Sequence, residues 1–351
     1  MKHFLIVILF LSVLFSTEGR ASDIRNFQVG EYIEGDSIPY RIVDETFELS
    51  FNELAGMLAG NEAYSMKRAE YLVENAYYGG SMSYNKYCSE IDSVVRILNR
   101  FIDDNNIRSY RTAPNFALFH FFTKPSPLNG NLKFTYDFDN PIGNEDCSVL
   151  FTSKVLASHK GQCASLPLLY KILCDELGGE CALAYAPMHL YIKHRGEDGQ
   201  WVNVELTHGG LVRDVFLMET LNISAEAVRN RIFMEALTEK ENIALMLVQL
   251  ARIYNYKYNS YDNFVEKCVE TVLSVFPDNC DALVMKTAFL RSQAKQYMET
   301  YGLDDSYFLA SVISEFNSIM NHLDSLGYSQ PTREERDREI EEGRRLMESR
   351  N

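Results

Sequence analysis

The sequence predicts an α+β protein whose C-terminal part is all-α, and two observations carry this prediction. Leucines fall on one helical stripe between residues 163 and 177, and two short extended runs, 188–193 and 201–206, follow with a turn between them. From residue 236 onward, apolar residues recur at helical spacing. We therefore expect a helix and a β-hairpin in the middle of the chain, followed by a region built from helices.

The first residues are expected to export the chain. Lys2 and His3 precede an apolar run from Phe4 to Phe15, and Gly19-Arg20-Ala21 supplies small residues of the kind that a signal peptidase reads. The run is too short to span a bilayer comfortably, so an N-terminal membrane anchor is the less favoured alternative. We predict a signal peptide cleaved near Ala21, a periplasmic or secreted mature protein, and no stable membrane span after cleavage.

The net charge limits the partners that the chain can bind, and the cysteine content limits its disulfides and metal sites. The formal net charge of −15 becomes −16 when residues 1–21 are removed. Such a chain repels phosphate backbones and has no clustered basic face, so we exclude nucleic acid as a partner. Seven cysteines is an odd number for a compartment that permits disulfides, so they cannot all be paired within the chain. No second close Cys/His pair has zinc-ligand spacing, and we expect neither a metal nor a cofactor.

Two domains are expected after the signal peptide, residues 22–235 and residues 236–351. The first domain begins with an irregular segment and then turns helical over 50–104, where apolar residues recur at three and four positions. Residues 111–148 are richer in Pro, Gly, Asn and aromatic residues, which predicts loop with one strand. A helix follows around 148–158.

The second domain resembles tetratricopeptide repeats, which pair two helices and end on proline. Residues 250–279 show this pattern and end on Pro277-Asp278-Asn279, and another helix pair is expected over 281–327. The tail from Thr332 is dense in Arg and Glu at helical spacing, which predicts a solvated capping helix.

The hairpin brings a histidine and a carboxylate together. Alternation along the strands puts His189 on the opposite face from Leu190, and Glu205 on the opposite face from Val204. The register that pairs Leu190 with Val204 also places His189 directly across from Glu205. This register needs an odd-length connection such as 196–198, with Gly199 free to adopt a left-handed conformation. A carboxylate beside an imidazole fixes its tautomer and stabilises the imidazolium, as in a catalytic triad.

Cys163 is the candidate nucleophile. It lies at a helix start after the turn at Gly161, where the positive end of the helix dipole favours the reactive thiolate. Backbone amides at the same helix end can hold an oxyanion, and the amide of Cys163 is the natural donor. Gln162 and Asn203 are the candidates for the second donor.

These residues resemble the transglutaminase-like cysteine superfamily. The resemblance rests on Lys160-Gly161-Gln162-Cys163 with its Leu-rich helix, on Pro187-Met188-His189 and on Trp201-Val202-Asn203-Val204-Glu205. More closely, the stretch is similar to a bacterial branch that couples this core to tetratricopeptide-like helices. The motifs cover residues 152–214, with a weaker similarity over 240–290.

The resemblance implies a papain/transglutaminase-like core, in which the helix bearing the cysteine packs on an antiparallel sheet. It also implies that Cys163 is the nucleophile, His189 the base and Glu205 the orienting acid. Two positions depart from the usual pattern: Glu205 is one methylene longer than the usual Asp, and Ala164 stands where an aromatic residue often follows the cysteine. Since the branch contains members without the nucleophile, the fold alone does not establish activity.

The leading hypothesis is an exported cysteine enzyme that acts on an amide or thioester-like acyl bond of a peptide or protein, as a peptidase, amidase or acyl transferase. The alternative is a non-catalytic scaffold, in which the papain-like groove and the helical repeats bind a peptide or protein partner.

Each site residue also has a plainer interpretation. Cys163 can be a core or disulfide cysteine, His189 a satisfied strand histidine, and Glu205 an ordinary cross-strand partner. His194 and His208 are expected in solvent or in loops.

Overall fold

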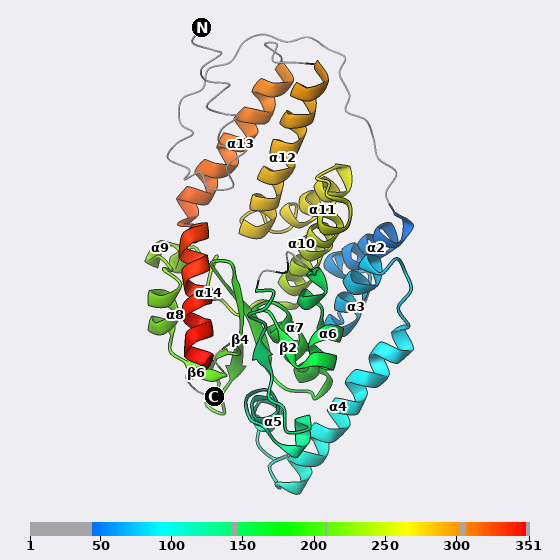
Figure 1. The fold of residues 1–351 in the computed structure, drawn as a ribbon, viewed down its shortest axis with the longest axis vertical. Helices are drawn as coiled ribbons and strands as arrows, with labels where there is room; N and C mark the ends of the chain where they lie inside the picture. Colours follow the sequence, from blue (N-terminus) through cyan, green and yellow to red (C-terminus); the bar gives the residue numbers. More distant parts are fainter. Residues whose placement is uncertain (1–43, 142, 144–145, 208, 302–306, 349–351) are drawn as a thin grey trace.

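The computed structural model describes residues 44–141, 143, 146–207, 209–301 and 307–348 of the 351-residue chain. The predicted signal peptide, residues 1–21, lies outside these ranges. The described residues form an α+β fold, as predicted, with an antiparallel sheet, a short parallel strand pair and numerous helices (Figure 1). None of the described helices has the length and apolar character needed to cross a bilayer.

The helical stretch predicted over 50–104 is confirmed as three helices with recognisable start signals. They are α2 (Glu45–Ala59), α3 (Met66–Tyr77) and α4 (Tyr84–Asp104). Each follows an N-cap residue, Asp44, Ser65 or Ser83, whose side chain accepts a hydrogen bond from a backbone N–H of the first turn. Capping and apolar periodicity therefore agree along this part of the chain.

Residues 111–148 contain more helix than the sequence predicted. The predicted single strand is present as β1 (Thr135–Tyr136), but α5 (Ala113–Thr123) occupies a stretch expected to be loop. This helix is apolar around most of its circumference, so it shows no clear polar face from which a helical period could be read. Short helices then lead toward the site: η2 (Pro127–Asn129), η3 (Cys147–Leu150) and α6 (Thr152–Ser158).

The antiparallel sheet has four strands in the order β3-β4-β5-β6. Their bounds are β3 (Cys181–Ala186), β4 (His189–Arg195), β5 (Trp201–Glu205) and β6 (Gly210–Val212). The hairpin β4–β5 was predicted, whereas β3 and β6 were not. Almost all of β3 is buried, so its sequence lacks the polar and apolar alternation that marks a half-exposed strand.

Helix α7 (Ser165–Glu176) packs against β3 and β4. Its completely buried leucines, Leu166, Leu169 and Leu173, belong to the same apolar core as Ile192 and Val204 of the sheet. Pro167 is tolerated because it lies in the first turn, where its missing N–H would have no helical partner. The helix that follows Cys163 is therefore held firmly against the sheet.

The described residues after 236 form helices and no strand, as predicted. These helices are α10 (Glu239–Tyr258), α11 (Asn263–Leu273), α12 (Cys280–Tyr301), α13 (Tyr307–Leu326) and α14 (Arg333–Glu348). Two shorter helices, α8 (Asp214–Thr220) and α9 (Ala225–Arg229), lie between the sheet and this region in the sequence. Helices α10 and α11 form one pair, and α12 and α13 form a second pair that extends away from the sheet (Figure 1).

The apolar core is continuous across the predicted boundary at residue 236. Helix α10 packs on α2 and α3, and the Tyr254 ring meets the Phe47 ring edge to face at 5.2 Å. The boundary itself remains a prediction. Helix α14, the predicted capping helix, is largely exposed and runs alongside the sheet region (Figure 1).

Candidate functional site

His189 and Glu205 form the centre of the candidate site. The His189 Nε2 atom lies 2.5 Å from Glu205 Oε2. The other carboxylate oxygen, Oε1, accepts hydrogen bonds from the backbone N–H of Thr207 at 2.9 Å and from its hydroxyl at 2.7 Å. Both oxygens of this buried carboxylate are thus satisfied, and the imidazole is held in one orientation.

The register that brings the pair together differs from the predicted one by two residues. Ile192, and not Leu190, pairs with Val204. A shift by two keeps every side chain on its face, so His189 and Glu205 still share a face but are diagonal neighbours instead of direct partners. The extra methylene of glutamate, noted above as a departure from the usual Asp, lets the carboxylate reach across this diagonal.

The turn explains the register. Gly196 N–H donates to Gln200 O at 2.8 Å, which closes the hairpin around residues 197–199 instead of the predicted 196–198. Gly199 adopts the left-handed φ of 76° that was expected of it. Asp198 stabilises the turn by accepting the Gln200 N–H at 2.9 Å.

The electrostatics of the pair favour the charged forms of both groups. Burial alone lowers the pKa of His189, but the charge of Glu205 and hydrogen bonds to Cys163 and Glu205 outweigh it and raise that pKa well above its ordinary value. Burial opposes the ionisation of Glu205, yet its interactions with His189 and Thr207 lower the pKa of Glu205 to about 2. The site therefore holds a buried imidazolium–carboxylate pair at neutral pH.

Cys163 lies beside this pair. Its thiol lies close enough to contribute to the raised pKa of His189, and since Nε2 faces Glu205, Nδ1 is the ring nitrogen left for the thiol. The Sγ atom also lies 3.8 Å from the carbonyl oxygen of Met188. Cys163 is partly exposed, so a substrate can approach its sulfur.

The chain around Cys163 is fixed by close packing at Gly161. This glycine lies in β2 (Lys160–Gly161), which pairs with β1, and is not the turn residue that the sequence suggested. A Cβ atom at Gly161 would lie 2.7 Å from Val155 Cγ2 and 2.9 Å from Ser165 Oγ. Ser165 Oγ in turn accepts the Gln162 N–H and donates to Val149 O, both at 2.8 Å. The turn that carries Cys163 is thus anchored on both sides.

Gln162 and Asn203, the candidate second oxyanion donors, have their side-chain amides engaged elsewhere. Gln162 Nε2 donates to Asn140 O at 2.5 Å and to Asp137 O at 3.3 Å. Asn203 Nδ2 donates to Asp214 Oδ1 at 2.6 Å. Either side chain would have to give up these hydrogen bonds before it could hold an oxyanion.

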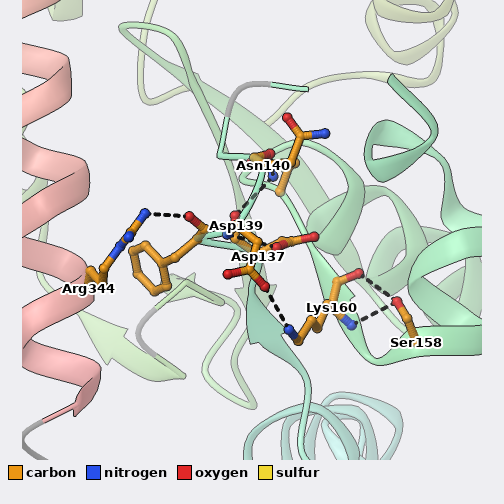
Figure 2. A network of polar contacts seen from close by, with 8 residues as sticks. Asp137, Asp139, Asn140, Ser158, Lys160 and Arg344 are labelled. Atoms are coloured by element: carbon orange, nitrogen blue, oxygen red, sulfur yellow. Dashed lines mark hydrogen bonds and ion pairs between the residues drawn. The ribbon is translucent and has the colours of Figure 1, made fainter. Parts of the chain in front are cut away.

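The loop over residues 137–140, whose carbonyl oxygens accept hydrogen bonds from the Gln162 amide, is held by two further side chains. Lys160 Nζ lies 3.2 Å from Asp139 Oδ2, and Arg344 of α14 donates a hydrogen bond to the carbonyl oxygen of Phe138 (Figure 2). The Arg344 Nη2 atom lies 2.7 Å from that oxygen. Helix α14 therefore touches the loop that positions the residue before Cys163.

Sequence reasoning missed three residues of the site. Thr207 orients Glu205 through its hydrogen bonds, and the carbonyl oxygen of Met188 lies next to the thiol of Cys163. The third residue is Tyr136. Burial is the main cause of the raised pKa of Tyr136, and the Cys163 thiol also contributes to it. Met188 has a left-handed φ of 51°, which is uncommon for a bulky residue. The parallel pairing of Tyr136 with Gly161 carries no local signal in the sequence.

The remaining cysteines and His194 are structural. All seven cysteines lie within the described residues and are free thiols, and apart from Cys163 and Cys88 they are buried. His194, expected in solvent or a loop, is instead buried in β4, with Nε2 2.5 Å from the Tyr170 hydroxyl. Burial lowers its pKa to about 4, so this histidine is neutral at pH 7. His208 lies outside the described residues.

Comparisons with protein-family models, with curated proteins and with solved structures gave no match to this chain. Within the described ranges, no group of three or more His, Cys, Asp or Glu side chains is arranged to hold a metal ion. The functional argument therefore rests on the geometry of Cys163, His189 and Glu205.

Proposed function

We propose that this protein is an exported, cysteine-dependent enzyme of transglutaminase-like type that forms an acyl-enzyme on Cys163. The observation that carries the proposal is the His189–Glu205 pair, with Nε2 2.5 Å from Oε2, next to the thiol of Cys163, which contributes to the raised pKa of His189. A partly exposed nucleophile, a base and an orienting acid in hydrogen-bond contact are the parts that acyl transfer requires. The substrate class is an amide or thioester-like acyl bond in a peptide or protein.

The proposed reaction begins with an imidazolium–thiolate pair. The thiolate of Cys163 attacks the carbonyl carbon, and the electron pair of the carbonyl moves to its oxygen. The backbone N–H of Cys163 donates to no other described residue, so it is available to that oxyanion. The imidazolium of His189 then transfers its proton to the leaving amine, and the C–N bond breaks.

The second half of the reaction regenerates the thiolate. Neutral His189 takes a proton from a water molecule or an amine, which attacks the acyl carbon and displaces the sulfur. Water would make the enzyme a peptidase or amidase, and an amine would make it an acyl transferase. Glu205 stays ionised throughout and stabilises the imidazolium whenever it forms.

Two structural features support a papain-like core as part of this proposal. Helix α7 begins two residues after Cys163 and packs on the antiparallel sheet, and His189 opens the strand β4 of that sheet. These are the relative positions of helix, cysteine and histidine that the motif resemblance implies. Export through a signal peptide over 1–21 belongs to the same proposal.

A matched pair of cysteine variants tests the proposal. Cys163 and Cys88 are the two cysteines that are not buried. We expect Cys163→Ser to abolish fast alkylation by iodoacetamide at neutral pH and to leave the thermal midpoint nearly unchanged, because a hydroxyl fits the same partly exposed volume. Cys88→Ser should leave the fast reaction intact.

The rival function, a non-catalytic scaffold, predicts a different result. In that case no cysteine reacts faster than an ordinary exposed thiol, and replacing Cys163 does not change the alkylation pattern. A strongly destabilised Cys163→Ser variant, from a parent without a fast thiol, would show that Cys163 is a packing residue. The location of the modified cysteine by mass spectrometry separates these cases.

A further inference from the structure

A pocket of about 200 Å³ lies next to the candidate site, between the sheet and the C-terminal helices. Its walls come from the end of β3, from the segment after α9, from the start of α10 and from the connection between α11 and α12. Met188 also lines the pocket, and its carbonyl oxygen is 3.8 Å from Cys163 Sγ. The pocket is therefore adjacent to the thiol, with Met188 as the residue common to both.

One carboxylate in this pocket lacks a partner. Asp281, in the first turn of α12, is half-buried and forms no hydrogen bond or ion pair with any described residue. The other two carboxylates of the wall are engaged: Glu241 accepts from Thr238, and Asp278 lies 2.7 Å from His322 Nε2. Burial raises the pKa of Asp281, and Arg252 offsets this only in part. A cation placed beside Asp281 would favour its charged form.

A second polar atom in the pocket wall is also unsatisfied. The hydroxyl of Tyr185 is buried and has no hydrogen-bond partner among the described residues. Tyr185 and Asp281 line the same pocket, and the charge of Asp281 contributes to the raised pKa of Tyr185, for which burial is the main cause. A buried hydroxyl without a partner is rare in a folded protein unless a ligand or water completes it.

The rest of the wall is largely apolar and aromatic. Ile232, Phe233, Leu237, Phe276 and Tyr328 line it. The only cation among the lining residues, Arg231, is directed to Glu235 at 3.3 Å. The lining therefore combines apolar and aromatic side chains with the carboxyl group of Asp281 and the hydroxyl of Tyr185.

We propose that this pocket is a specificity subsite that takes a lysine-type side chain of the peptide substrate, with Asp281 and Tyr185 binding its ammonium group. A flexible aliphatic stem with a terminal cation matches a lining that is mostly apolar and includes a carboxylate. The volume suits one extended side chain and is smaller than typical pockets for larger ligands, which measure about 300–1,000 Å³. This inference rests on the proposed function, because it needs Cys163 to be the group that attacks the substrate.

The test uses thiol-directed peptide probes. Tripeptidyl chloromethyl ketones carry lysine at each of the three positions before the warhead, with norleucine as the uncharged control of the same length. We expect one lysine probe to alkylate Cys163 at least tenfold faster than its norleucine counterpart, which corresponds to about 1.4 kcal/mol. In Asp281→Asn the ratio of the two rates should fall close to one, and in Tyr185→Phe it should fall in part.

A matched acidic control separates a specific subsite from general attraction. Glu239 lies in the first turn of α10, as Asp281 does in α12, but does not line the pocket. Glu239→Gln should keep the lysine preference, whereas loss of the preference in this variant would overturn the proposal. Equal rates for the lysine and norleucine probes at all three positions, with fast iodoacetamide alkylation of Cys163, would overturn the subsite and leave the proposed function standing. If iodoacetamide itself does not react fast, the proposed function has failed and the subsite fails with it.

Discussion

Removing the charge of Glu205 should destabilise the protein in a pH-dependent way. In Glu205→Gln the amide oxygen can still accept both hydrogen bonds from Thr207, so the substitution changes mainly the charge facing His189. The pKa of Glu205 is about 2, against an ordinary value of 4.5. At 1.36 kcal/mol for each pKa unit, the native interactions of this carboxylate stabilise the folded protein by about 3 kcal/mol at neutral pH.

The sign of the pH dependence follows from the two pKa directions. Because the pKa of Glu205 is lowered by folding, its contribution is present above pH 4.5 and is lost as the pH falls toward 2. Because the pKa of His189 is raised, its contribution is present below pH 6.5 and is lost as the pH rises through the folded value. The stability difference between wild type and Glu205→Gln should therefore be largest between about pH 4.5 and 6.5.

Urea denaturation followed by the fluorescence of Trp201, the single tryptophan, measures this difference. A double-mutant cycle with His189→Gln isolates the interaction between the two side chains, because each single variant removes one partner. We expect a coupling energy of up to about 3 kcal/mol near pH 6, falling to less than half of that near pH 3. A coupling energy that is below about 0.5 kcal/mol, or that does not change with pH, would refute the buried ion pair.

Two further predictions concern residues that support the site. Gly161→Ala should lower the free energy of unfolding by about 1–3 kcal/mol and slow the alkylation of Cys163, because the new methyl group would overlap Val155 and Ser165; unchanged urea stability would contradict this. Glu70 and Glu74 form a buried carboxylate pair, and burial together with the charge of Glu74 raises the pKa of Glu70. The contribution of Glu70 is therefore present at acidic pH and lost as the pH rises, so Glu70→Gln should gain stability relative to wild type between pH 5 and pH 8. A stability difference between Glu70→Gln and wild type that does not change with pH would contradict the raised pKa of Glu70.

Local signals were sufficient for the elements that have caps and an amphipathic face. Helices α2 to α4 follow Asp44, Ser65 and Ser83, and their apolar residues recur at helical spacing, so tertiary structure was not needed to predict them. Helix α5 and strand β3 were missed for a common reason. Strand β3 is almost entirely buried, and α5 is apolar on nearly all sides although Phe116 is exposed, so neither has the pattern of polar and apolar residues that reveals a period.

In the site, too, local sequence patterns predicted which residues share a face, whereas the strand register and the distant residues depended on tertiary structure. Alternation along β4 and β5 was enough to place His189 and Glu205 on one face, but it could not fix the register, because a shift by two residues preserves every face. The helix start identified Cys163. Tyr136 and Thr207 reach the site through strand pairing and a bend after β5, and neither position has a sequence pattern of its own.

The central claim is that His189 activates Cys163, and the rate of iodoacetamide alkylation at Cys163 as a function of pH tests it most directly. In the wild type we expect a fast reaction at neutral pH, because the raised pKa of His189 keeps an imidazolium beside the sulfur. In His189→Gln the rate at pH 7 should fall at least tenfold and climb only in alkaline solution, as for an ordinary thiol. Identical pH profiles for the two proteins would contradict the account.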